Sequence, residues 1–195
     1  MDTEKELLSI ISKEDFNILL EKFKRKFGKP KKTKRLAIQC TDYDYQDIDT
    51  RVRVTNGVAE IIQKVGKWNA TSRIEIRTPL PPSSDAVFNA YKTLRNLLKR
   101  HKIETSIIQL ENWVFERANF EIKLTHQFGK KDVYNYEIEV LSDELSPLDI
   151  ASKFNMPIDS PLTTPEFWKQ WNESVNLYAD QLSDDELKNI ISNYF

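Results

Sequence analysis

The chain has 195 residues, a formal net charge of −1 at pH 7 and 30% charged residues, which suits one domain, or one domain with an appendage. One cysteine, Cys40, and two histidines exclude a disulfide framework and a conventional zinc site. The balanced charge excludes a global basic field for nucleic acid. No apolar run approaches membrane-spanning length and no signal peptide is visible, so we expect an intracellular protein, cytoplasmic or nuclear and of cellular or viral origin, that does not contact a membrane.

The first part of the chain predicts a strand followed by a helix. Residues 3–11 are typical of a strand on which Glu4 and Glu6 share one face. Ser12 is a suitable N-cap for an amphipathic helix over residues 13–27. This order places two carboxylates on one strand face close to the start of the chain.

A basic segment and four closely spaced strands are expected next. The segment 29–35, Lys-Pro-Lys-Lys-Thr-Lys-Arg, is predicted to be a loop, either a solvated connector or an electrostatic guide for a polyanion. Asn56-Gly57 is a strong signal for a two-residue hairpin. The strands are predicted over residues 35–42, 50–55, 58–65 and 71–78. Their charged residues fall on shared faces: Arg51 and Arg53, then Glu60 and Lys64, then Arg73, Glu75 and Arg77.

A helix and three further strands complete this region. The proline-rich segment 79–82 is expected to end the sheet, and Ser84 or Asp85 to cap a helix reaching about residue 102. Strands are then predicted over residues 105–116, from Arg117 to about residue 125, and over residues 133–141. The second of these has Arg117, Glu121 and Lys123 on one face, and the third has Glu137 and Glu139.

The C-terminal residues have a helical pattern. A short helix is expected after Pro147, and a longer one begins at Pro165. The pattern Ser183-Asp-Asp-Glu is a capping box for a last helix to about residue 194. We therefore predict a tunnel domain over residues 1–145 and a helical appendage over residues 146–195 that packs on it. The aromatic stripe of the longer helix could instead bind a partner; it comprises Trp168, Trp171, Val175, Tyr178 and Leu182.

Together these elements predict an α+β fold, a closed eight-stranded antiparallel β-barrel with a polar, charged interior and flanking helices. The helices carry apolar stripes that need an apolar sheet face to cover, so the charged face would line the interior. Buried charges require ionic partners. Arginine and lysine beside carboxylates suit a polyphosphate bridged to Mg²⁺ or Mn²⁺. An ordinary barrel with solvated strand faces is the simpler alternative.

Several spaced motifs resemble one family. They are Glu4-Lys5-Glu6, Arg-Val-Arg-Val-Thr-Asn-Gly from Arg51, Ile-Ile-Gln-Lys to Lys64, Arg-Ile-Glu-Ile-Arg from Arg73 to Arg77, Phe-Glu-Arg at Arg117, and the closing Glu137-Ile-Glu139. The set resembles the triphosphate tunnel metalloenzymes, or CYTH superfamily. Within that superfamily it is most similar to small viral and fungal-type RNA 5′-triphosphatases of mRNA capping.

The resemblance implies a tunnel in which a metal and a triphosphate bind side by side. The metal would be held by Glu4, Glu6, Glu137 and Glu139. The phosphates would be bound by Arg51, Arg53, Lys64, Arg73, Arg77, Arg117 and Lys123. The catalytic residues would be Glu75, Arg51, Arg117 and Lys64. Leu8 stands where the family's first motif has a lysine, and Lys123 or a lysine of the basic segment is the candidate to replace it.

The substrate is not fixed by these motifs. A triphosphate-ended RNA is the first expectation, with other capping enzymes as partners. Inorganic triphosphate or a nucleotide is the second, and an adenylyl cyclase is less favoured because no adenine pocket is apparent. A non-catalytic tunnel that binds polyphosphate is a third hypothesis, favoured by Leu8. The oligomeric state is open, with a homodimer among the options.

Overall fold

The computed structural model describes residues 5–42, 48–66, 74–98, 103–140, 144–158 and 165–195. The chain forms two compact units, which we describe separately. The first unit comprises Met1–Thr33 and Leu110–Val175, and the second comprises Lys34–Gln109 and Asn176–Phe195. Predictions for Glu4 and Arg73 lie outside the described residues. The second predicted helix ends at Leu97, earlier than the predicted end near residue 102.

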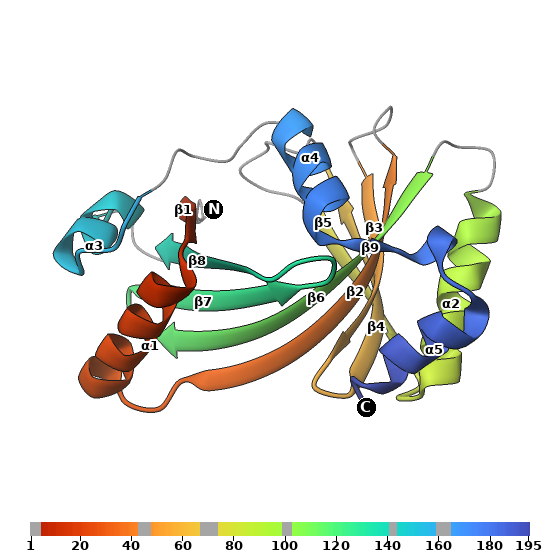
Figure 1. The fold of residues 1–195 in the computed structure, drawn as a ribbon, viewed down its shortest axis with the longest axis horizontal. Coiled ribbons are helices and arrows are strands. Elements are labelled where there is room, and N and C mark those ends of the chain that lie inside the picture. The colour runs from red at the N-terminus through yellow and green to blue at the C-terminus, as the bar shows by residue number, and fades with distance from the viewer. Residues whose placement is uncertain (1–4, 43–47, 67–73, 99–102, 141–143, 159–164) are drawn as a thin grey trace. The chain divides into compact units, whose positions relative to one another are not determined.

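The fold combines a sheet of antiparallel strands with helices (Figure 1). Their order is β1-β8-β7-β6-β2-β3-β4-β5, and β9 pairs with β6. Helices together with an antiparallel sheet confirm the predicted α+β class. In the described residues no pairing joins the end strands β1 and β5, so hydrogen bonds do not close the sheet into the predicted barrel. The bounds are β1 Lys5–Ile11, β2 Lys31–Asp42, β3 Ile48–Thr55, β4 Val58–Val65, β5 Ile74–Leu80, β6 Ile103–Glu116, β7 Phe120–Phe128, β8 Val133–Val140 and β9 Leu177–Tyr178.

Three helices belong to the first unit: α1 (Lys13–Phe27), α3 (Pro147–Lys153) and α4 (Pro165–Val175). Helices α1 and α3 pack on β8. The apolar stripe of α1 packs against the apolar faces of β7 and β8 and forms one core with them. The charged faces of both strands lie on the side away from this core. Its members include Phe16, Leu19, Leu20 and Phe23 from α1, Ile122 and Leu124 from β7, and Tyr136, Ile138 and Val140 from β8.

Helix α1 has the predicted bounds because both of its ends are capped. The side chain of Ser12 accepts a hydrogen bond of 3.0 Å from the backbone N–H of Asp15. At the other end Gly28 has φ of 86°, a conformation that glycine adopts without a Cβ clash. The capping residues Ser12 and Gly28 therefore set both ends of the helix.

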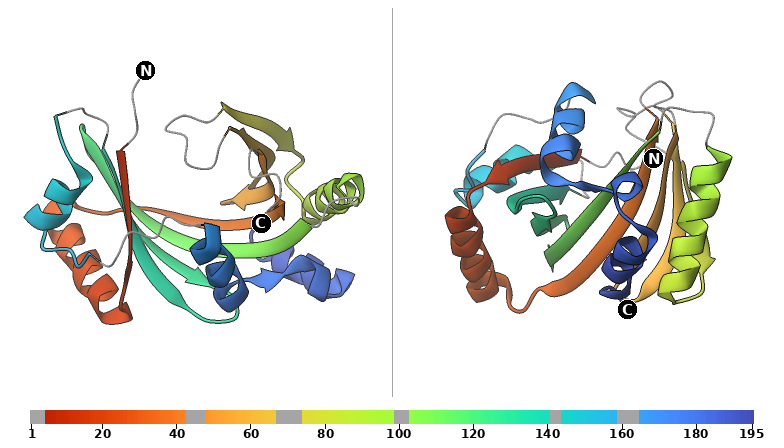
Figure 2. Two further views of the ribbon diagram at one scale, coloured as in Figure 1. Left: turned by 90° about the horizontal axis from the view of Figure 1, so that it is seen from above. Right: turned by 45° about the vertical axis from the view of Figure 1, so that its right-hand side comes forward.

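The second unit has the same organisation, with different helices. Helix α2 (Ser84–Leu97) packs on β3 and β4 and lies beside α5 (Asp184–Ser192), with the 3₁₀ turn η1 (Ala179–Gln181) preceding α5 (Figures 1 and 2). The predicted hairpin is confirmed, since Asn56 and Gly57 both have positive φ, 49° and 81°. The core includes Leu36 and Ile38 from β2, Val52 and Val54 from β3, Ala59 from β4, Val87 and Tyr91 from α2, and Leu187 and Ile191 from α5.

The basic segment is mostly strand, so its prediction as a loop was wrong. β2 begins at Lys31, four residues earlier than expected. Ion pairs satisfy its first lysines: Lys31 Nζ lies 3.3 Å from Glu116 and Lys32 Nζ lies 3.0 Å from Glu111. Lys32 also lies over the ring of Trp113, 4.9 Å from its centroid. Charge density alone did not reveal these partners on β6.

Other boundaries differ because a local partner outweighs the pattern. Ser83, one residue earlier than predicted, caps α2 by accepting a hydrogen bond from the N–H of Ala86. β5 continues through Pro79 to Leu80, as an edge strand permits. The predicted helical stripe ends with α4 at Val175, and Tyr178 pairs instead with Ser106 in β9.

The C-terminal segment is divided between the two units. Its residues up to Val175 belong to the first unit and those from Asn176 belong to the second. The short helix after Pro147 and the capping box at Ser183 are confirmed. The predicted boundary near residue 145 is a different division of the chain and stays a prediction. No helix of the described part is both long and apolar enough to cross a membrane.

Phe23 is the best test of how α1 is held. Its side chain is fully buried and packs against the rings of Phe27, Phe115 and Phe154. We expect Phe23→Ala to lower the free energy of unfolding by about 3–5 kcal/mol through the cavity that it leaves. Ile18→Ala is the matched control on the same helix, because Ile18 is 57% exposed, and a change within about 0.5 kcal/mol is expected. Urea unfolding followed by circular dichroism measures both, and equal effects would contradict the packing described.

Candidate metal and phosphate site

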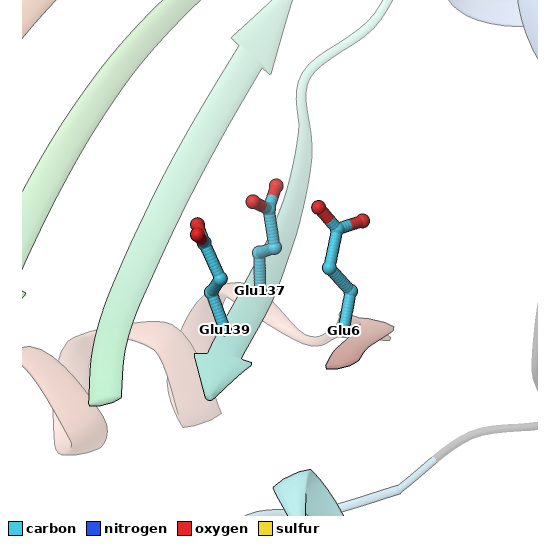
Figure 3. Close-up of side chains that lie close together, drawn as sticks. All are labelled: Glu6, Glu137 and Glu139. Atoms are coloured by element: carbon cyan, nitrogen blue, oxygen red, sulfur yellow. The ribbon is translucent and has the colours of Figure 1, made fainter. Parts of the chain in front are cut away.

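Three carboxylates of the first unit converge. Glu6 comes from β1, and Glu137 and Glu139 come from β8 (Figure 3). One oxygen of each lies within 4.8 Å of an oxygen of the other two. We call this set the carboxylate cluster. Period-two alternation brings it about, because Tyr136, Ile138 and Val140, the residues between and beside the two β8 glutamates, point into the core.

Strand register extends the cluster into two rows on one sheet face. Glu6 lies opposite Glu139, which lies opposite Glu121 of β7. In the adjacent row Leu8 lies opposite Glu137, which lies opposite Lys123. Glu121 was on the predicted polar face but was not predicted as a site residue; pairing its strand in register with the closing Glu-Ile-Glu strand would have found it.

Lys123 is a cation in direct contact with the cluster. Its Nζ lies 2.7 Å from Glu137 Oε1 and 3.8 Å from Glu121 Oε1. The three side chains are only 25–28% exposed, so solvent screens their charges less than it would on an open surface. Lys123 thus partly neutralises the acidic face, in the same row as the apolar Leu8 but on the other side of Glu137.

The pKa of Glu121 is shifted by its surroundings. Burial raises its pKa, the positive charge of Lys123 opposes this, and the negative charge of Glu137 raises the pKa further. The pKa of Glu121 therefore lies above its ordinary value. A divalent cation at this face would relieve the repulsion between the carboxylates.

The carboxylate cluster fits a hard divalent cation. Mg²⁺ and Mn²⁺ prefer oxygen ligands, and three carboxylates at this spacing offer them without any thiolate or imidazole. Glu4 lies outside the described residues. The predicted metal set is therefore brought together in its three described members.

Arg117 is placed differently from the other predicted phosphate ligands. It lies in the turn between β6 and β7, where its N–H donates to the carbonyl of Phe120 at 2.9 Å, so the strand predicted to start at Arg117 starts at Phe120. Its Nη2 donates to the carbonyl of Phe27 at 2.7 Å, and its guanidinium stacks on that ring at 4.3 Å. These contacts hold the C-terminal end of α1.

The other predicted cations that the structure describes form ion pairs on the polar face of the second unit. Arg53 donates from Nε and Nη2 to Glu60 Oε1 at 3.0 and 2.7 Å, with only 11% and 15% of the two side chains exposed. Arg51 pairs with the buried carboxylate of Asp49. Asp49 was missed by the sequence reasoning, although it lies two residues before Arg51 and hence on the same strand face.

Glu75 joins two more of these cations. Lys64 lies opposite it in the strand register, with Nζ 3.4 Å from Glu75 Oε2, and Arg77 Nε lies 2.5 Å from Oε1. Burial raises the pKa of Glu75, but the hydrogen bond from Arg77 and the charge of Lys64 outweigh it, so the pKa lies below its ordinary value. Glu75 is therefore a carboxylate held in its charged form. Arg73 lies outside the described residues.

Comparisons with known proteins identify the fold. No family model and no curated protein matches the sequence. Among solved structures the chain is similar to a candidate adenylate cyclase from Bacillus halodurans, with a TM-score of 0.60 and 15% identity over 86% of this chain and 98% of that one. A candidate adenylyl cyclase from Hippeastrum, described as having dominant triphosphatase activity, gives 0.59 and 13% over 87% and 96%. A chain of the Schizosaccharomyces pombe Mediator head module gives 0.51 and 9% over 80% and 96%. Identities this low show a shared fold alone.

Glu121 gives the site a testable pH dependence. A carboxyl group whose pKa is raised by folding stabilises the folded state when protonated; this contribution is complete below the ordinary pKa and is lost as the pH rises through the raised pKa. We therefore expect Glu121→Gln to raise the urea midpoint at about pH 7, and to raise it less at about pH 4. Glu21→Gln, at a side chain on α1 that is 61% exposed, is the control and should change neither midpoint by a comparable amount. A lower midpoint for Glu121→Gln at neutral pH would mean that its attraction to Lys123 dominates.

Proposed function

We propose that the chain is a metal-dependent triphosphatase of the CYTH superfamily, which hydrolyses the terminal, or γ, phosphate of a triphosphate. The observation that carries the proposal is the carboxylate cluster of Glu6, Glu137 and Glu139, whose oxygens lie within 4.8 Å of one another. Phosphoryl transfer depends mainly on positioning and charge neutralisation. A cluster of this kind, on a strand face that also carries Lys123, suits that chemistry.

In this proposal Glu6, Glu137 and Glu139 hold Mg²⁺ or Mn²⁺. Glu4, two residues before Glu6 in the sequence, is the fourth proposed metal ligand. The bound ion would supply charge neutralisation and orientation of the phosphate oxygens. Glu121 adds negative charge in the same cross-strand row. Lys123 replaces the lysine that is absent at Leu8, and its ammonium group lies 2.7 Å from a carboxylate of the cluster.

The cations of the second unit would bind the phosphates. Arg51, Arg53, Lys64 and Arg77 each have a carboxylate partner, so a phosphate must share or replace that partner. Arginine has five N–H donors and can bind a phosphate oxygen while retaining one carboxylate contact. Arg73 completes this predicted set. Glu75, held charged by two of the cations, would orient the attacking water.

The tunnel itself is part of the proposal. Its interior would be polar and charged, as predicted for an eight-stranded barrel. Side chains and ligand would enclose the site, and the proposal does not require hydrogen bonds between β1 and β5. Arg117 would act indirectly, by fixing the end of α1 through Phe27.

Triphosphate-ended RNA is the substrate that we propose first, with a role in mRNA capping. The exposed Lys31 and Lys32 at the start of β2 would attract the RNA backbone, although each also pairs with a glutamate. Inorganic triphosphate or a nucleotide is the second candidate, favoured by the triphosphatase activity ascribed to the similar Hippeastrum protein. RNA specificity would appear as faster release of phosphate from triphosphate-ended RNA than from ATP.

Catalysis itself is tested by substitutions in the carboxylate cluster. We expect phosphate release from triphosphate-ended RNA, ATP or inorganic triphosphate to require Mg²⁺ or Mn²⁺ and to stop with a chelator. Glu139→Gln should lower kcat by roughly 100-fold or more, the scale of one lost electrostatic contact in an active site. Glu21→Gln, at a 61% exposed position on α1, is the control and should retain full activity. A folded protein that releases no phosphate would instead favour a polyphosphate-binding module, a role consistent with Leu8.

Lys123 is expected to have two opposing effects. Its ammonium group competes with a divalent cation for Glu137, so Lys123→Met should tighten Mn²⁺ binding, by roughly fivefold if the ion pair contributes about 1 kcal/mol. The same change should raise KM for the triphosphate if Lys123 contacts phosphate. Titration calorimetry and steady-state kinetics measure the two effects, with the exposed Lys13→Met as control. Weaker Mn²⁺ binding in Lys123→Met would contradict the competition.

A further inference from the structure

Strand β5 leaves one edge of the second unit open. It is the end strand of the order, and among the described residues only β4 pairs with it. Six of its seven residues are exposed, including Ile74 at 68% and Ile76 at 49%. An exposed edge strand with large apolar side chains is a template for pairing with another strand.

The exposed isoleucines belong to a larger apolar strip. In the strand register Ile74 lies opposite Val65, which lies opposite Ile48, itself 47% exposed. These residues share a sheet face with Val52 and Val54, which join the core formed with α2 and α5. Helices α2 and α5 therefore cover one part of this face, and the strip with Ile48, Ile74 and Ile76 is exposed to solvent.

We propose that β5 pairs in antiparallel fashion with β5 of a second copy of this chain, with Ile76 at the two-fold axis. In that register Glu75 lies opposite Arg77 of the second copy, and Arg77 opposite the second copy's Glu75. The edge is thus complementary to itself, as an isologous interface requires. Ile74 lies opposite Thr78, so the five central residues pair without using Pro79, which has no N–H to donate.

The charges favour a copy of the same strand over an unrelated peptide. Opposite charges directly across an antiparallel pair are stabilising, and like charges are destabilising. Arg77 is 61% exposed and already contacts Glu75 of its own chain, but its guanidinium has further donors for a second carboxylate. Pairing would also join the apolar strips of the two copies into one continuous sheet face. Ile76 of each copy would then lie between β4 of its own chain and Ile76 of the second copy.

Sedimentation velocity over a concentration series tests the proposal directly. We expect a monomer–dimer equilibrium at concentrations up to roughly 500 µM, because an interface this small binds weakly. Ile76→Lys places two like charges across the axis and should raise the dissociation constant by at least about tenfold. Ile48→Lys is the control: Ile48 is equally exposed and lies on the same face, but β3 is an interior strand. Circular dichroism verifies that both variants fold.

A charge exchange provides the second arm. Glu75→Arg alone places arginine opposite Arg77 of the second copy and should weaken the dimer, whereas Glu75→Arg combined with Arg77→Glu should restore it. A monomer at every concentration, whether β5 stays open or pairs within its own chain, would overturn the proposal. So would equal effects of Ile76→Lys and Ile48→Lys, which would indicate packing of faces. The readout is molecular mass, so it is independent of triphosphatase activity.

Discussion

Both units depend on one constraint, the need of a two-faced strand to bury its apolar side. In the first unit α1 satisfies this need for β7 and β8, and in the second unit α2 and α5 satisfy it for β2, β3 and β4. Once the apolar faces are covered, the period of two leaves glutamate, lysine and arginine together on the opposite faces. The charged site is thus a consequence of where the cores form, because a slip of one residue would exchange the two faces.

The sequence was sufficient where local chemistry decides the structure. Ser12 and Gly28 set the ends of α1, and Asn56-Gly57 set the hairpin between β3 and β4. Alternation alone also predicted that Glu6, Glu137 and Glu139 lie on polar faces. It did not predict that Glu121 lies in the same row as Glu139, because that depends on the register between β7 and β8.

Sequence reasoning failed where a distant partner decides the structure. The lysines at the start of β2 looked like a solvated loop, yet Glu111 and Glu116 of β6 pair with them. Arg117 fitted the alternation, but Phe27, ninety residues away in sequence, accepts its hydrogen bond. Tyr178 fitted the predicted helical stripe, but it lies in β9 and pairs with Ser106 of β6. In each case the missing information was a tertiary contact and not a local preference.

The pairing of the described cations on the charged faces with carboxylates bears on how such a face could bind an anion. An unpaired, half-buried arginine would make the empty site costly, whereas Arg53 beside Glu60 is compensated before any ligand arrives. A phosphate that bound there would exchange one negative partner for another, so the net gain in affinity would be smaller than a count of cations suggests. The same reasoning applies to Lys123, whose contact with Glu137 partly neutralises the carboxylate cluster and would be exchanged for a divalent cation if one bound there. Charge balance in the unliganded face therefore favours ligands that bring both charges together, a polyphosphate with its metal ion, over a bare anion.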